Sequence, residues 1–228
     1  MSSSQENYPI DQKTLWDKQH YARRAEHREM AATPNSFAVG CVGYLNDGDR
    51  VLEFGSASGR DARFFTRKKN CSVVAIDFSQ NALGHLKEDA AEDGSIDFMQ
   101  PLAADIKKFP LKNRKGPVFN AIYSRSSLHI SDHDLDLLLA QSLEMLKPGG
   151  YLMIEGKTPR DPKIKSSAEV ADNLVIDGGG HLRRVWNKEY IIEQIIKKFG
   201  LKLILMNFSS GKTLDRGSAY INFIAQKQ

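Results

Sequence analysis

Short apolar runs alternate with helical segments through most of this 228-residue chain. The runs predict strands at residues 51–54, 71–77, 96–100, 118–124 and 151–155. Helical patterns follow three of these runs, over 59–69, 79–91 and 131–146. Strands that alternate with helices in this way predict a mostly parallel sheet whose two faces are both covered.

The end of the chain departs from this alternation. A helix that begins after Asn187 and stops at Gly200 is followed by two strands, 201–208 and 219–226, with no helix between them. Because a parallel pair needs a crossover connection, these two strands must pair antiparallel. We therefore expect an α/β, Rossmann-like, doubly wound sheet of seven strands with an antiparallel last strand, helices on both faces and an N-terminal helical lid.

Two segments lie outside the alternating pattern. Helix formers without Gly or Pro fill residues 11–32, so we interpret residues 1–36 as an N-terminal helical extension or lid and residues 37–228 as the main domain. Within that domain, the stretch 156–187 holds two prolines and the run DGGG, at which NLVI can turn back into HLRRVW as a hairpin. We expect this stretch to be an insertion that covers a substrate.

Composition excludes several classes of protein. No apolar run reaches the roughly 18 residues of a membrane span, and the N-terminus lacks the pattern of a secretory signal, so we expect no membrane partner. Cys41 and Cys71 have no metal-like spacing, which predicts reduced thiols in the cytosol and no metal site. A net charge of +4 permits an anionic partner without requiring one.

The most informative local sequence is VLEFGSASGRDA, residues 51–62, where a strand ends in a run of small residues. Gly55 and Gly59 can adopt a positive φ and expose bare backbone, and Ala57 is small enough to let a flat ligand approach. The helix that follows directs free N–H groups toward the same place. A tight strand-to-helix turn without a ligand remains the alternative interpretation.

Polar residues at the ends of the next strands point to the same edge of the sheet. Asp77 comes 22 positions after Gly55, where an acidic residue accepts hydrogen bonds from ribose hydroxyls. The alternative role of Asp77 is to cap the helix that starts near Ser79. Asp105 could accept from an adenine amine, or be an exposed loop residue, and residues 124–129 end the fourth strand on the same rim.

A nicotinamide cofactor fits the glycine-rich turn poorly. The dinucleotide fingerprint requires glycines at relative positions one, three and six, and these positions hold Gly55, Ala57 and Arg60. An arginine where the helix must pack closely on the strand argues against a dehydrogenase, which we keep as a distant alternative.

The chain resembles the class I S-adenosylmethionine-dependent methyltransferases, most closely those acting on small molecules. The motifs that carry the resemblance, in chain order over residues 50–228, are VLEFGSASGRDA, VVAIDFS, AADIKKFP, IYSRSSLHI and LKPGGYLMIE. Two positions depart from the family pattern: Ala57 replaces the usual middle glycine, and Asn120 stands where many members have aspartate. Residues 37–228 would then be the methyltransferase domain, with S-adenosyl-L-methionine as cofactor and S-adenosyl-L-homocysteine as product.

The resemblance also implies roles for individual residues. Glu53 would hold the loop or the cofactor amine, and Asp77 would bind the ribose hydroxyls. Arg125 would lie near the methionine carboxylate or at the rim of the site. The other cofactor-binding residues implied are Gly55, Ser56, Ala57 and Gly59 around the methionine part and sugar, Phe78, Asp105 and Ile106 around the adenine, and Ser124 beside the methionine part.

Methyl transfer from a sulfonium needs alignment more than acid–base help, so a base is required only if the acceptor must lose a proton early. His129 is our first candidate for that base, although it could equally help to start the next helix. His181 in the insertion, and Tyr21 on the N-terminal helix, are candidates for the acceptor pocket. Trp16 could line the same pocket or be a packing residue, and Arg183 and Arg184 could bind an acidic acceptor or lie on a solvated face. We expect His20, His27 and His85 to be surface residues.

We therefore predict methyl transfer to a small-molecule acceptor by a monomer or homodimer. An RNA or protein methyltransferase is a second possibility, based on the basic residues 67–69 and 112–115, although the fourth strand lacks the motif for methylating base amino groups. A non-catalytic, cofactor-binding subunit is a third.

Overall fold

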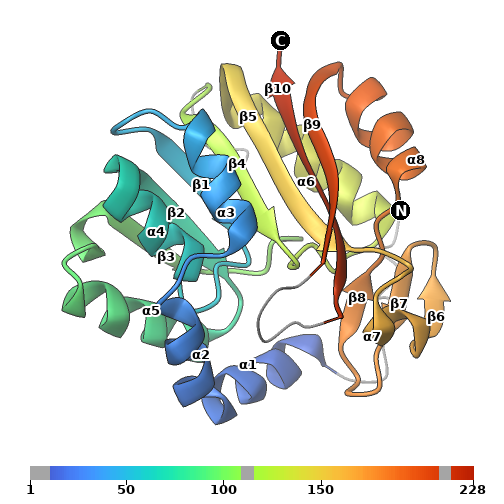
Figure 1. The fold of residues 1–228 in the computed structure, drawn as a ribbon, viewed down its shortest axis with the longest axis horizontal. Coiled ribbons are helices and arrows are strands. Elements are labelled where there is room, and N and C mark those ends of the chain that lie inside the picture. Colours follow the sequence, from blue (N-terminus) through green and yellow to red (C-terminus); the bar gives the residue numbers. More distant parts are fainter. Residues whose placement is uncertain (1–10, 109–115, 211–216) are drawn as a thin grey trace.

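The computed structural model describes residues 11–108, 116–210 and 217–228 (Figure 1). Its centre is a seven-stranded sheet in the order β3-β2-β1-β4-β5-β10-β9. The strands are β1 (Arg50–Phe54), β2 (Ser72–Asp77), β3 (Met99–Ala103), β4 (Phe119–Arg125), β5 (Leu146–Lys157), β9 (Leu201–Ser210) and β10 (Ala219–Lys227). β1 to β5 pair in parallel, whereas β10 is antiparallel to both β5 and β9. The expected fold class is confirmed.

Helices cover both faces of this sheet, because alternate side chains of the buried strands point to opposite sides. On one face, Val51 of β1 packs with α3 (Ser36–Cys41), α4 (Arg60–Lys69) and α5 (Gln80–Glu92). On the other face, Leu52 packs with α6 (Asp132–Met145) and with the helix that begins as α8 (Lys188–Tyr190) and continues as a π-helix over Ile191–Lys197. Figure 1 shows α3 and α4 in front of the sheet and α6 behind it.

Side-chain caps fix where three of the helices begin. The hydroxyl of Ser79 accepts the amide N–H of Ala82 at 3.1 Å, and that of Ser131 accepts the N–H of Asp134 at 3.1 Å. Asn187 caps α8 in the same way. These bonds satisfy amide groups that have no partner within the helix, and they lie where the sequence predicts helix starts.

Three boundaries differ from the sequence prediction. The N-terminal helix is broken at Arg23 into α1 (Gln12–Ala22) and α2 (Arg24–Ala31), with Arg24 of α2 anchored on Asp89 of α5. β3 begins at Met99 rather than Ile96, because residues 96–98 form a 3₁₀ turn. Lys147–Gly150 does not form a separate turn: α6 runs directly into β5, and a register shift against β4 absorbs these residues, with Gly149 at φ +77°.

The insertion is more elaborate than a single hairpin. After α7 (Pro162–Lys165), the strands β6 (Ala168–Ala171), β7 (Leu174–Ile176) and β8 (Leu182–Arg184) form an antiparallel three-stranded sheet. The predicted hairpin is its β7–β8 half. The turn of that hairpin contacts the N-terminal helix, since Gln12 of α1 donates to the carbonyl of Gly180 at 3.0 Å and accepts the N–H of Leu182 at 2.8 Å.

The two additions to the central fold meet over one edge of the sheet. In Figure 1, α1 lies across the end of the sheet at which the parallel strands terminate, with β7 and β8 beside it. The middle of α1 is tied to the start of α5, because Asp17 accepts the hydroxyl of Ser79 at 2.7 Å and the side-chain amide of Asn81 at 2.7 Å. In the described part of the chain, we find no helix with the length and apolarity needed to cross a bilayer.

Candidate active site

The glycine-rich loop after β1 is shaped by its neighbours as much as by any ligand. Gly55 has φ +69°, and a Cβ there would lie 2.0 Å from the Cβ of Ser127, on the loop after β4. The hydroxyl of Ser127 donates to the carbonyl of Phe54 at 2.6 Å and holds the two loops together. Gly59, at φ +74°, begins α4, where a Cβ would lie 2.6 Å from Leu86. Each glycine is therefore required by backbone conformation and by a close approach.

Asp77 stands at the end of β2 and accepts backbone N–H groups from both sides. Its carboxylate accepts the N–H of Ala57 at 2.9 Å and that of Ser79 at 2.9 Å. The first bond holds Ala57 at a positive φ of 48°, which is unusual for a residue with a side chain. The second bond orients the chain just before α5, but the cap of that helix is Ser79 and not Asp77. Burial raises the pKa of Asp77, although these N–H groups oppose the shift.

Glu53 is buried at the end of β1, 4% exposed, and one of its carboxylate oxygens has no hydrogen-bond partner among the described residues. Burial, together with the negative charges of Asp61 and Asp77, raises the pKa of Glu53 well above its ordinary value. The hydroxyl of Ser56 in the same loop is also buried, with no hydrogen-bond partner in the part of the chain that the structure describes. Such groups are costly when they are unsatisfied, so this end of the sheet is arranged to receive a polar, positively charged group.

These residues line one side of a cavity of about 590 Å³. Of the residues implied for the cofactor, the lining includes Glu53, Gly55, Ser56, Ala57, Asp77, Phe78, Asp105, Ile106 and Arg125. Gly59 and Ser124 are not in the lining: Gly59 starts α4, and the buried hydroxyl of Ser124 lies 2.7 Å from that of Ser127. Arg125 is held by Glu155 at 2.9 Å and lies over the ring of Tyr220.

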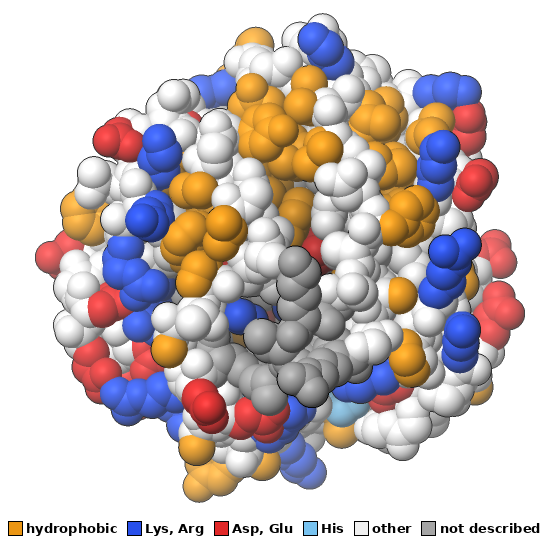
Figure 2. Space-filling model, in the orientation of Figure 1, with side chains coloured by type: hydrophobic (Ala, Val, Ile, Leu, Met, Phe, Trp, Pro, Cys, Tyr) orange, Lys and Arg blue, Asp and Glu red, His pale blue; other side chains and the backbone are white. Residues whose placement is uncertain are grey.

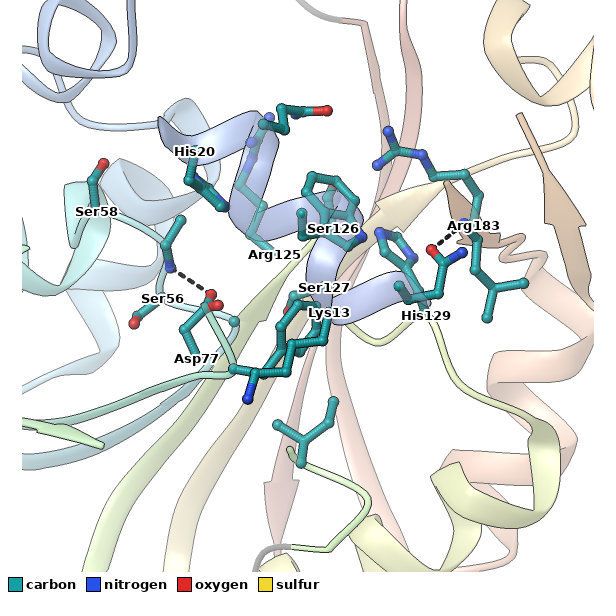
Figure 3. A pocket seen from close by; sticks show the side chains of 18 of the residues that line it. Lys13, His20, Ser56, Ser58, Asp77, Arg125, Ser126, Ser127, His129 and Arg183 are labelled. Carbon is teal, nitrogen blue, oxygen red and sulfur yellow. Dashed lines mark hydrogen bonds between the residues drawn. The ribbon is translucent and has the colours of Figure 1, made fainter. Parts of the chain in front are cut away.

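The opposite side of the cavity is built from α1, the insertion and the loop after β4. Figure 3 shows His129 and Arg183 together on this side, across from Ser56, Ser58 and Asp77. We call this side the acceptor half and define it by its lining residues Trp16, His129, Lys157, Leu182, Arg183 and Tyr220. For Trp16 the sequence left open pocket lining or packing, and for Arg183 binding of an acidic acceptor or a solvated face; both residues line the cavity.

His129 lines the acceptor half, but its hydrogen bonding does not suit a general base. Its Nδ1 accepts the backbone N–H of Arg184 at 3.1 Å. Burial lowers the pKa of His129 well below its ordinary value, so the ring is neutral near pH 7. A neutral ring whose Nδ1 accepts must carry its proton on Nε2. His129 therefore presents a hydrogen-bond donor, and the base suggested by the sequence is not supported.

The other two candidates for the acceptor pocket lie outside the cavity lining. Tyr21 is 73% exposed and is not part of the cavity lining. His181 packs edge-on against Trp16 with ring centroids 4.6 Å apart, and its Nδ1 lies 3.4 Å from Asp177. Tyr21 lies on a face of α1 that does not line the cavity. His181 is also outside the lining, but it packs against Trp16, which is part of the lining.

Several residues expected at the surface are buried. His20 is only 7% exposed, and its Nδ1 lies 3.3 Å from the Nδ1 of His27. Burial lowers the pKa of each to about 4, so both are neutral near pH 7. Arg184 is fully buried between Trp186 and Tyr190 and donates to the carbonyl of Ile130 at 2.8 Å. Only tertiary contacts reveal these positions, because a lone histidine or arginine carries no sequence signal of burial.

Comparisons with known proteins agree with this geometry. Residues 51–150 match the family model described as a methyltransferase domain. The methyltransferase GfsG of Streptomyces halstedii is 24% identical over 180 residues, covering 78% of this chain and 61% of that protein. The phosphoethanolamine N-methyltransferase of Plasmodium falciparum is 32% identical over 113 residues, covering 48% of this chain and 40% of that protein. This chain thus spans between two-fifths and about three-fifths of the length of these curated relatives.

Among solved structures, the 1,6-didemethyltoxoflavin-N1-methyltransferase of Burkholderia thailandensis, with bound 1,6-didemethyltoxoflavin and S-adenosylhomocysteine, superposes with a TM-score of 0.68. The identity is 13%, and the match covers 100% of this chain and 92% of that chain, so it shows a shared fold. The chain thus shares the Rossmann-like fold of that neighbour, and its residues 51–150 match a methyltransferase domain. The resemblance of this chain to the class I S-adenosylmethionine-dependent methyltransferases is confirmed, with residues 51–150 as its matched methyltransferase domain.

Proposed function

We propose that this chain transfers the methyl group of S-adenosylmethionine to a small-molecule acceptor. The observation that carries the proposal is the continuous cavity of about 590 Å³, which joins the glycine-rich loop to the acceptor half. This volume falls in the range of about 300–1,000 Å³ that is typical of small-ligand sites. Both relatives named above, and the structural neighbour, are called methyltransferases.

We call the side of the cavity opposite the acceptor half the loop half. Its residues, which fit the proposed cofactor, are Glu53, Gly55, Ser56, Ala57, Asp61, Asp77, Phe78, Asp105, Ile106 and Arg125. The partnerless carboxylate oxygen of Glu53 suits the cofactor ammonium group, and the carboxylate of Asp77 has lone pairs left for ribose hydroxyls. Arg125 suits the methionine carboxylate, because its guanidinium lines the cavity. Phe78 and Ile106 offer apolar surface for the adenine, with Asp105 beside them.

The chemistry asked of the protein is mainly alignment. The bound cofactor supplies a methyl group that is already activated on a sulfonium. The loop half fixes the donor, the acceptor half places the nucleophile in line, and α1 with the insertion excludes water. The Nε2–H of His129 is placed to orient the acceptor by donating a hydrogen bond rather than by removing a proton.

The surface supports a small acceptor more than a nucleic acid. On the face shown in Figure 2, Lys and Arg side chains lie among Asp and Glu and do not form one continuous basic stripe. Of the basic residues that suggested an RNA partner, Arg67 is paired with Asp93 and Lys69 lies 3.7 Å from Asp47, while residues 112–115 lie outside the described residues.

Calorimetry with S-adenosylhomocysteine tests the cofactor half of the proposal, followed by methyl-transfer assays on a panel of small molecules. Gly55→Ala should abolish binding, because the new Cβ collides with Ser127 in a backbone conformation that side chains rarely adopt. Gly84→Ala is the matched control: this glycine lies in α5, where a Cβ meets nothing within 4 Å, so binding should be retained. No binding by the unmodified protein would refute the proposal, and binding without turnover on any acceptor would favour a non-catalytic subunit.

A further inference from the structure

The two halves of the cavity differ in charge. All the buried carboxylates in the described lining belong to the loop half; they are those of Glu53, Asp61 and Asp77. The acceptor half instead contains the buried cations of Lys157 and Arg183, which are paired with Asp161 and Asp177, two carboxylates that are not part of the lining. A ligand that fills the acceptor half therefore meets cationic side chains and aromatic rings but not the carboxylates that pair with those cations, which suits an anion attached to a flat ring. This inference rests on the function proposed above.

Arg183 is the cation best prepared to hold such an anion. It is 8% exposed, and its Nε donates to Asp177 at 2.9 Å. Its guanidinium carbon lies 4.7 Å from the centroid of the Trp16 ring. These two contacts fix the plane of the guanidinium while its two terminal nitrogens make no hydrogen bond to another described residue. A fixed fork of this kind matches the two oxygens of an oxyanion.

His129 adds a second unused donor to the acceptor half. Its Nε2–H is buried with no partner among the described residues. The ring is held in place through Nδ1 by the backbone of Arg184, whose side chain is anchored in turn on Ile130 and Asp132. The plane of His129 is nearly parallel to that of Trp16, at 14°. The Nε2–H of His129 and the ring of Trp16 thus have fixed positions relative to each other.

We propose that the acceptor is an aromatic or conjugated oxyanion, whose charged group is bound by the terminal nitrogens of Arg183 and whose ring packs against Trp16. Carboxylate and phosphate groups share this chemistry. The Nε2–H of His129 then donates to a polar atom of the same ring. The acceptor half selects a methyl acceptor that is negatively charged and planar, while the loop half binds the methyl donor.

Ligand-observed NMR and calorimetry on the full chain saturated with S-adenosylhomocysteine test this inference with three probes: benzoate, benzamide and phenyl phosphate. Benzoate should bind at least about tenfold more tightly than benzamide, since the two share a ring and differ in charge. Tighter binding of phenyl phosphate than of benzoate would identify phosphate as the preferred oxyanion. Equal binding of benzoate and benzamide, or binding of none of the three probes by a protein that binds S-adenosylhomocysteine, would overturn the inference and leave the proposed function standing. Failure to bind S-adenosylhomocysteine would instead refute the proposed function.

Variants assign the effect to the guanidinium fork. Arg183→Met should lower the affinity of the preferred oxyanion by about 10- to 100-fold and leave the affinity for S-adenosylhomocysteine within about twofold. Arg183→Lys keeps the charge beside Asp177, so it protects the fold, but it loses the fork and should still lose several-fold in oxyanion affinity. Lys165→Met is the matched control, since Lys165 is exposed on α7 and is not part of the lining. Equal oxyanion affinities in the Arg183→Met, Arg183→Lys and Lys165→Met proteins would show that Arg183 does not bind the acceptor.

Discussion

Replacing Asp77 separates the two roles that its position allows, which are binding the cofactor ribose and shaping the loop. Asp77→Ala leaves the amide groups of Ala57 and Ser79 without their acceptor, each at a cost of about 1–3 kcal/mol. Removing a carboxylate whose burial raises its pKa returns part of that cost. We expect the free energy of unfolding to fall by about 2–4 kcal/mol in the absence of ligand.

The ribose role adds an effect that loop shaping alone does not produce. Loss of hydrogen bonds from ribose hydroxyls to a carboxylate should weaken S-adenosylhomocysteine binding by about 1–3 kcal/mol, a factor of roughly 5 to 150. The unmodified protein should therefore prefer S-adenosylhomocysteine over its 2′-deoxy analogue, and Asp77→Ala should lose that preference. Calorimetry with both ligands measures the four affinities, and urea denaturation measures stability.

Ser79→Ala is the control for this experiment. It removes the hydroxyl that caps α5, which should cost about 1 kcal/mol of stability, but Ser79 does not line the cavity. If Asp77→Ala discriminates between the two ligands as well as Ser79→Ala does, Asp77 acts on the loop alone. Since the ionised carboxylate is the acceptor, ligand affinity should also fall with decreasing pH through the raised pKa of Asp77.

Three further predictions follow from buried groups. Burial raises the pKa of Glu53, so at pH values above the ordinary carboxyl pKa its ionised form lowers the free energy of unfolding. Glu53→Gln should therefore raise the melting temperature at pH 7, and this gain should shrink toward about pH 4. The same substitution should weaken cofactor binding. An unchanged melting temperature at both pH values would contradict this reasoning. ¹⁵N NMR should find the proton of His129 on Nε2 and no titration between roughly pH 5 and 8, and a proton on Nδ1 would refute the donor role. Arg184→Met should lower the free energy of unfolding by roughly 2–4 kcal/mol, whereas Arg160→Met at an exposed position should change it little. Equal stabilities of these two variants in urea would mean that the Arg184 contacts contribute nothing.

The sequence by itself determined the elements of the sheet and the cofactor side of the site. Strand and helix positions follow from local apolar periodicity, and helix starts follow from caps such as Ser131, which needs only the backbone three residues away. The loop from Gly55 to Gly59 is recognisable in the sequence because positive φ angles restrict which residues fit, although its close contacts with Ser127 and Leu86 are tertiary. The start of β3 was missed by three residues, since a short 3₁₀ turn has no distinct periodicity.

Only the tertiary structure decided the acceptor side. Trp16 lines the cavity while Tyr21, on the same helix, is exposed, and this outcome depends on which face of α1 packs over the sheet. That face is fixed by Gln12, which bonds to Gly180 and Leu182 across about 170 positions in the chain. Contacts between segments so distant in sequence leave no periodic signal. The tautomer of His129 is likewise set by the backbone of a distant strand. Local interactions specify the elements, whereas the acceptor half exists only once separate elements have packed together.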